Sequence, residues 1–163
     1  MSVKKNDLVQ FIGGLQTLTD EVPEIMTKIA VGEGVYAVKQ ARLICTNDSP
    51  DIVNTGDYRR NWKSDQTAKR AGRRFIVRFY NPLDYAGHLE HGFRSHFVPG
   101  HWDGKSFVYQ PKDPQGGMFV HSLIPGHYTL ERAVNATKRT QDARLQRRFE
   151  QELKKRGYMK YFK

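Results

Sequence analysis

The histidines are the residues of this chain that most readily suggest chemistry. His88 and His91 are three residues apart, which is one helical turn, and His96 and His101 follow soon after. Zinc could be bound by three imidazoles and a carboxylate such as Glu90. The spacing matches no metal motif, however, and the second pair falls in a glycine-rich stretch. We therefore expect surface or hydrogen-bonding histidines, with no metal and no cofactor.

Acid–base catalysis is the second chemistry to consider. Asp84, His88 and Glu90 lie close together in sequence and could act as the acid and base of a hydrolase. The sequence offers no nucleophile elbow, no phosphate-cradling glycine loop and no spaced carboxylate pair to accompany them. We therefore expect no enzymatic activity. The single cysteine, Cys45, excludes an internal disulfide.

Basic and aromatic residues are interleaved between residues 58 and 80. The basic residues are Arg59, Arg60, Lys63, Lys69, Arg70, Arg73, Arg74 and Arg78, and the aromatic ones are Tyr58, Trp62, Phe75 and Tyr80. Such a mixture can bind phosphates and stack on bases. In the alternative interpretation, which we prefer, the aromatic residues belong to the core and the arginines occupy the outer face of a strand. A basic nucleic-acid-binding protein stays open as a function of a different class.

Two helices are expected in the first third of the chain. Apolar residues recur at helical spacing over residues 6–18, which predicts one amphipathic helix. A second helix that begins near residue 19 would place Pro23 in its first turn, where proline is tolerated. The breaker cluster at 46–50 should end this second helix.

The remainder of the chain indicates short strands and a long helix. Residues 58–66, 73–80 and 119–124 are expected as strands, and residues 94–118, rich in glycine and proline, as a long irregular loop. A helix should run from about 126 to 156, with a basic extension from about 140 that projects from the body.

These elements predict one α+β domain over residues 1–163. A small antiparallel sheet should pack against the N-terminal helices and the long C-terminal helix. Its core should bury five residues together, namely Trp62, Phe75, Val77, Phe79 and Leu130.

The most distinctive pattern runs from residue 55 to residue 93. Its residues are Thr55, Gly56, Arg59, Trp62, Asn81, Tyr85, Ala86, Glu90 and Gly92, and a glycine and helix follow at 126–133. This order and spacing resembles the minor tail-component family of lambdoid (HK-type) tailed phages, whose members are neck or tail-completion proteins. The resemblance covers about residues 50–140.

The resemblance implies a structural virion protein at the neck, between head and tail. It implies a homo-oligomeric ring, hexameric in the first instance with a dodecamer as the alternative, that completes the tail and joins it to the DNA-filled head. The implied partners are a head-completion or connector protein, a tail terminator or tail-tube proteins, and double-stranded DNA in the lumen. Another reading is a tail terminator that caps the tail tube. Assembly would take place in the host cytoplasm.

Charge is unevenly distributed along the chain. Residues 1–58 carry 5 basic and 8 acidic side chains (−3), residues 59–117 carry 11 and 5 (+6), and residues 118–163 carry 11 and 4 (+7). Opposite charges could therefore meet across each joint of a ring. The expected contacts between subunits or with partners are Arg144, Arg147, Arg148, Phe149, Leu153, Tyr158, Tyr161 and Phe162. No apolar run approaches the roughly 20 residues of a membrane helix, so no membrane contact is expected.

Overall fold

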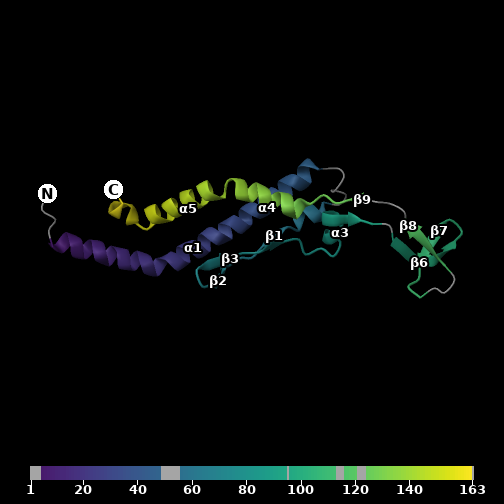
Figure 1. The fold of residues 1–163 in the computed structure, drawn as a ribbon, viewed down its shortest axis with the longest axis horizontal. Coiled ribbons are helices and arrows are strands. Elements are labelled where there is room, and N and C mark those ends of the chain that lie inside the picture. Colours follow the sequence, from purple (N-terminus) through teal and green to yellow (C-terminus); the bar gives the residue numbers. More distant parts are fainter. Residues whose placement is uncertain (1–4, 49–55, 95, 113–115, 121–123, 163) are drawn as a thin grey trace. The chain divides into compact units, whose positions relative to one another are not determined.

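The computed structural model describes residues 5–48, 56–94, 96–112, 116–120 and 124–162. The chain divides into two compact units: unit 1 comprises Met1–Pro82 with Leu130–Lys163, and unit 2 comprises Leu83–Thr129. Helices and antiparallel strands occur together (Figure 1), so the predicted α+β class is confirmed. In place of the one expected sheet, the described residues form four small sheets. No helix among these residues is both long and apolar enough to cross a membrane.

Unit 1 is built on one long helix, α1 (Lys5–Asn47). The C-terminal helix α5 (Gln141–Lys155) and the 3-10 helix η1 (Tyr158–Tyr161) run beside it (Figure 1). The apolar stripe of α1 meets the apolar face of these two elements, as expected for amphipathic helices. The buried residues of this core are Leu18, Ile25, Ile29, Leu153 and Tyr158.

The predicted boundary between two N-terminal helices is wrong, because α1 continues through Pro23. Proline inside a helix removes one hydrogen bond and costs about 3 kcal/mol. Leu18 and Ile25, on either side of Pro23, are both buried in the unit 1 core. The apolar packing on both sides therefore holds together a helix that local sequence would interrupt.

The segment after α1 begins with a helical turn where a strand was expected. Gly56, with φ 80°, precedes the short helix α2 (Asp57–Arg60). Strands β1 (Lys63–Ser64) and β4 (Phe79–Tyr80) then pair, and β2 (Lys69–Ala71) pairs with β3 (Arg74–Ile76). The expected strand 73–80 is therefore two strands with different partners.

The C-terminal helix is also divided. α4 (Thr129–Arg139) ends one residue before Thr140, and α5 begins after it. Thr140 leaves helical geometry with φ −121°, and its hydroxyl accepts a hydrogen bond from the Arg144 guanidinium at 2.6 Å. This break lies in a polar stretch of the sequence, between the apolar residues of α4 and those of α5. No apolar side chain there favours continuation of the helix.

Unit 2 contains α3 (Ala86–His91), the paired strands β5 (Gly92–Phe93) and β9 (Ile124–Pro125), and a three-stranded sheet. The sheet has the order β7-β6-β8, from β7 (Ser106–Tyr109), β6 (His96–Asp103) and β8 (Gly117–Val120). The prediction of an irregular loop over 94–118 is therefore wrong for most of that stretch.

The glycines of this stretch explain the difference. Gly104, with φ 60°, forms the turn between β6 and β7. Gly100 and Gly117 lie inside strands, where an added Cβ would come within 2.8 Å of the Phe107 ring and 2.1 Å of the Phe97 ring. These glycines make room for neighbouring aromatic rings in a sheet, which composition alone cannot distinguish from a loop.

The predicted core is correct in its centre and wrong at its edge. Trp62 is 2% exposed and packs against Tyr58 and Phe79, with ring centroids 5.6 and 5.9 Å apart. Phe75, Val77 and Phe79 are half-buried. Leu130 is 40% exposed, because the apolar face of α4 is directed elsewhere.

Replacing Trp62 should therefore destabilise the protein strongly. We expect Trp62→Ala to lower the free energy of unfolding by about 3–5 kcal/mol, because it leaves a cavity in a packed aromatic cluster. The matched control is Trp102→Ala, since Trp102 is 59% exposed. Urea unfolding followed by circular dichroism measures both variants, and equal losses would contradict this account of the core.

Candidate functional site

The residues of the distinctive pattern lie at structural positions in the two units. In unit 1, the Asn81 side-chain amide donates to the Tyr58 carbonyl at 2.7 Å and so fixes the end of β4 against α2. Arg59 donates to the Thr46 hydroxyl at 3.5 Å, and Trp62 is central to the core. These residues position the backbone between α1 and the strands. Thr55 lies outside the described residues.

In unit 2 the pattern forms the α3 turn and its closure. Tyr85 precedes α3 and is exposed, whereas Glu90 is 8% exposed. Gly92 ends the helix with φ 78°, a conformation that favours glycine. Gly126 packs so closely on this turn that an added Cβ would lie 2.2 Å from the Glu90 carbonyl oxygen. These residues of the pattern therefore fix the conformation of the backbone around α3.

The residues considered for catalysis and metal binding are not assembled into a site. Asp84 and His88 are exposed while Glu90 is buried. The His96 imidazole lies against the Arg94 carbonyl at 3.1 Å. In the ranges that the structure describes, no group of three or more His, Cys, Asp or Glu side chains could hold a metal ion.

A groove of about 390 Å³ lies in unit 1, between α1, the strands and the C-terminal helices. It is lined by apolar residues such as Phe75, Val77 and Leu145, and also by the carboxylate of Glu33. Because Glu33 is already bound by two arginines, it is not available as an acid or base. The groove offers no catalytic arrangement.

Those two arginines come from α5. The Arg144 guanidinium donates from Nε to Glu33 Oε1 at 2.8 Å, and Arg148 donates to the same oxygen at 2.9 Å. Arg144 also lies 3.7 Å above the ring of Tyr36 and is 5% exposed. The hydrogen bonds that Arg144 donates to Glu33 raise the pKa of the Arg144 guanidinium. Gly32 allows this approach, since a Cβ there would lie 2.4 Å from Arg148 Nη1.

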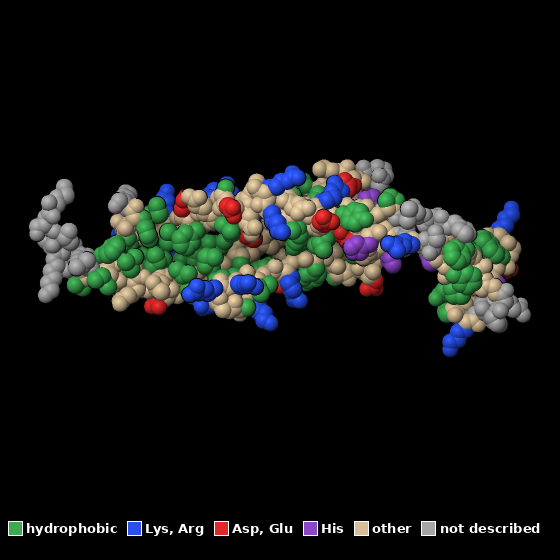
Figure 2. Space-filling view, in the orientation of Figure 1, with side chains coloured by type: hydrophobic (Ala, Val, Ile, Leu, Met, Phe, Trp, Pro, Cys, Tyr) green, Lys and Arg blue, Asp and Glu red, His purple; other side chains and the backbone are tan. Residues whose placement is uncertain are grey.

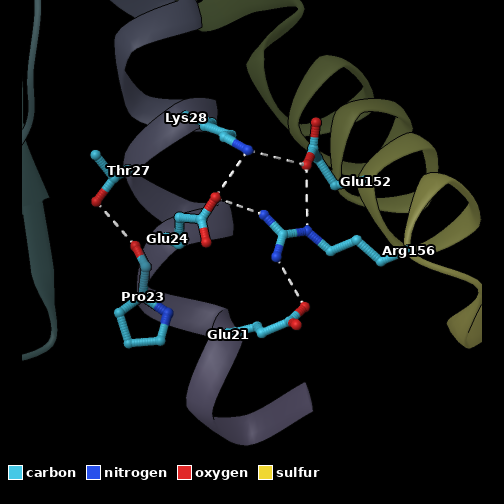
Figure 3. A network of polar contacts seen from close by, with 7 residues as sticks. All are labelled: Glu21, Pro23, Glu24, Thr27, Lys28, Glu152 and Arg156. Carbon is cyan, nitrogen blue, oxygen red and sulfur yellow. Dashed lines mark hydrogen bonds and ion pairs between the residues drawn. The ribbon is translucent and has the colours of Figure 1, made fainter. Parts of the chain in front are cut away.

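A second ionic cluster joins the same two helices nearer the chain ends (Figure 3). Arg156 donates to Glu21 and to Glu24, both at 2.8 Å, and Lys28 Nζ lies 2.8 Å from Glu24. Hydrogen bonds from Lys28, and then from Arg156, lower the pKa of Glu24 to about 2. On α4, Arg132 pairs with Asp48, which follows α1.

The expected contact residues are therefore mostly used within the chain. Arg144, Leu153 and Tyr158 are buried in unit 1, and Arg148, Phe149 and Tyr161 are half-buried there. Arg147 and Phe162 remain exposed. The expectation of a projecting basic extension from about residue 140 is wrong, because α5 packs along α1. Removing residues 144–163 would consequently remove part of the core.

Several apolar side chains are exposed, and two groups of them are suited to contacts with other molecules. We call the first the end patch; it lies in unit 1 and consists of Val9, Phe11, Ile12, Met159 and Phe162. The second is the sheet patch of unit 2, which consists of Trp102 and Tyr109 on one face of the sheet; Phe97 and Phe119 are exposed on its other face. The pairs Phe97–Phe119 and Trp102–Phe107 lie directly opposite each other across the sheet. Exposed apolar groups of this kind mark contact surfaces.

Sequence reasoning identified Phe162 in the end patch but missed the sheet patch. The signal available was the alternation of aromatic residues at 97, 107, 109 and 119 around glycines. This signal was hidden by the abundance of glycine and proline.

Neutralising Glu33 should destabilise the protein. In Glu33→Gln, the nearly buried charge of Arg144 loses its partner, and we expect the free energy of unfolding to fall by about 3 kcal/mol. Glu131→Gln is the control, because Glu131 is exposed on α4. Chemical unfolding at neutral pH measures the difference, and a loss no larger than that of the control would contradict a structural role for this pair.

The cluster in Figure 3 also predicts a pH dependence. The pKa of Glu24 is lowered from 4.5 to about 2 in the folded protein, so its contribution to stability is present above pH 4.5 and is lost as the pH falls toward 2. Glu24→Gln should therefore flatten the pH dependence of the unfolding free energy in this window.

The control for this measurement is Glu150→Gln. Glu150 accepts a hydrogen bond from Gln146 and belongs to no ion pair that the structure describes. Its variant should follow the wild-type pH profile between pH 6 and pH 2. An unchanged profile in Glu24→Gln would argue against the cluster.

Comparison with known proteins gives one match. Residues 10–92 match the protein family described as "Bacteriophage HK97-gp10, putative tail-component". Searches of curated proteins and of solved structures found no match. The matched region begins earlier than the pattern recognised in the sequence, since it takes in most of α1, and it ends at Gly92, before the glycine and helix at 126–133. Because the match spans just over half of the chain, this protein belongs to the HK97 gp10-like family and is a structural tail component of a bacteriophage virion.

Proposed function

We propose that this protein forms a ring of identical subunits at the phage neck, where it completes the tail and joins it to the DNA-filled head. Family membership supports a structural role in the tail. One structural observation favours a ring in particular: the chain exposes two different apolar surfaces, the end patch in unit 1 and the sheet patch in unit 2.

A closed ring requires a heterologous joint, in which one surface of each subunit meets a different surface of the next. Two distinct apolar patches on separate units provide such a pair. Trp102, Tyr109 and Phe162 are aromatic residues of the kind that supply most of the energy of an interface. We therefore assign the sheet patch of one copy to the end patch of its neighbour.

The distribution of charge supports contact between unit 2 of one copy and unit 1 of the next. Unit 1 carries 24 basic and 13 acidic side chains (+11), and unit 2 carries 3 and 4 (−1), which together give the net charge of +10. Contact between two copies of unit 1 would bring strongly positive surfaces together. Contact between unit 1 and unit 2 avoids this repulsion, so a heterologous joint is favoured over a symmetric dimer.

A basic nucleic-acid-binding protein is the second candidate function. It is favoured by the exposed cations of the β2–β3 hairpin, over which Lys and Arg side chains gather in Figure 2. In that case the purified chain would bind DNA without forming rings. A tail terminator, the remaining alternative, would form rings that cap tails without joining heads.

Mixing two defective variants tests the ring joint. The sheet variant combines Trp102→Ser with Tyr109→Ser, and the end variant combines Val9→Ser with Ile12→Ser. We expect each alone to be folded and monomeric, because each lacks one side of the joint. An equimolar mixture should form one intact joint and stop at a heterodimer, which size-exclusion chromatography with light scattering would detect.

The matched control is Val35→Ser with Leu43→Ser, which removes two exposed apolar side chains of α1 outside both patches. This control should form rings like the wild type in electron micrographs, and should join added heads and tails. Rings from the sheet variant, or from the mixture, would contradict the proposed joint. Capped tails without joined heads would indicate a terminator.

A further inference from the structure

The β2–β3 hairpin carries a concentration of positive charge. Lys69, Arg70 and Arg74 lie in the three register pairs of one two-stranded hairpin, Arg73 lies in its turn, and all four are exposed. At about 3.3 Å per residue, the backbone positions that carry these four cations span roughly 10 Å. Each paired cation faces an uncharged residue across the hairpin, so the positive charge is directed to the surroundings on both faces.

No carboxylate of the chain neutralises these cations in the residues that the structure describes. The sequence from 66 to 83 contains no acidic residue. The nearest carboxylate in the sequence, Asp65, accepts hydrogen bonds from the Arg78 backbone and side chain at 3.0 and 3.1 Å. Arg78 thereby lowers the pKa of Asp65 and occupies it.

One cation of the hairpin, Arg70, is held in a fixed position by two contacts. Arg70 Nε donates to the Gly72 carbonyl at 3.1 Å, and its guanidinium lies 5.9 Å from the centre of the Phe75 ring. Gly72 turns the chain with φ 60° at the tip. A short, tightly turned hairpin with a positioned arginine suits contact with a regular array of anions.

A second copy of the chain offers no matching acidic surface in the described part of unit 1. Most carboxylates there already form ion pairs within the chain, namely Glu21, Glu24, Glu33, Asp48, Asp57, Asp65 and Glu152. The others are Asp20, Glu131, Asp142 and Glu150, which are spread over three helices. The described part of unit 1 therefore offers no dense negative charge to the hairpin of a second copy.

We propose that the β2–β3 hairpin binds the phosphate backbone of double-stranded DNA. If the chain forms a ring, as proposed above, this contact would be made with the DNA that passes through its channel. Double-stranded DNA presents one negative charge per about 1.7 Å of its axis, which matches closely spaced cations without requiring any base sequence. The hairpin would thus hold DNA without specificity.

The experiment measures binding of the full chain to a fluorescent DNA duplex at salt concentrations from 50 to 200 mM. The hairpin variant combines Lys69→Ala, Arg70→Ala, Arg73→Ala and Arg74→Ala. The matched control combines Arg147→Ala, Lys154→Ala, Lys155→Ala and Lys160→Ala, which removes four exposed cations from the same unit without breaking an ion pair that the structure describes. Circular dichroism establishes that both variants are folded.

We expect the hairpin variant to bind more weakly and with a shallower dependence of log K on log salt. Each cation that neutralises a phosphate contributes about 0.9 to this slope, so four contribute up to about 3.6. The control should keep the wild-type slope. Equal losses in both variants, or no binding by the wild type at 50 mM salt, would overturn the proposal.

Two further outcomes distinguish failure of the DNA contact from failure of the proposed ring function. If the hairpin variant binds DNA normally but no longer joins heads to tails, the hairpin contacts an acidic partner protein and the proposal is wrong. If the wild type forms no rings and the slope still falls as expected, the DNA contact stands and the ring function fails. Electron micrographs of the same preparations provide this second readout.

Discussion

The structure of unit 1 depends on the attraction between the acidic side of α1 and the basic side of the C-terminal helices. Glu33 binds two arginines of α5, and Arg156 binds two glutamates of α1 nearer the chain ends. Apolar packing lies between these ionic clusters, with Leu18, Ile25, Ile29, Leu153 and Tyr158 buried together. The ion pairs fix the register of the helices, so that each apolar residue meets its counterpart.

This register explains several features that local sequence leaves unexplained. Pro23 is accommodated because the helix on both sides of it is held to the same partner. Gly14 and Gly32 are required on α1 because Tyr161 and Arg148 approach closer than a Cβ would allow. A residue larger than glycine at either position would displace the Tyr161 ring or the Arg148 guanidinium from its place against α1.

Internal pairing also decides which surfaces remain for assembly. Because most carboxylates of α1 are neutralised within the chain, unit 1 keeps an excess of positive charge, part of which lies on the β2–β3 hairpin. Some of the apolar residues not used in the core form the end patch and the sheet patch. The ring joint and the DNA contact proposed above would use separate surfaces of the chain. The exposed cations, the apolar patches and the residues that fix the backbone conformation thus lie in different parts of the chain.

The sequence by itself determined the α+β class, the amphipathic stripe of α1 and the central burial of Trp62, because these follow from local periodicity. It also identified the family through residues that fix backbone geometry. Only the tertiary structure decided that the acidic and basic segments pair within one chain, since complementary charge does not specify whether the partner is the same molecule or its neighbour. The strands around Gly100 and Gly117 were likewise decided by packing, because a glycine beneath an aromatic ring and a glycine in a loop are identical in sequence.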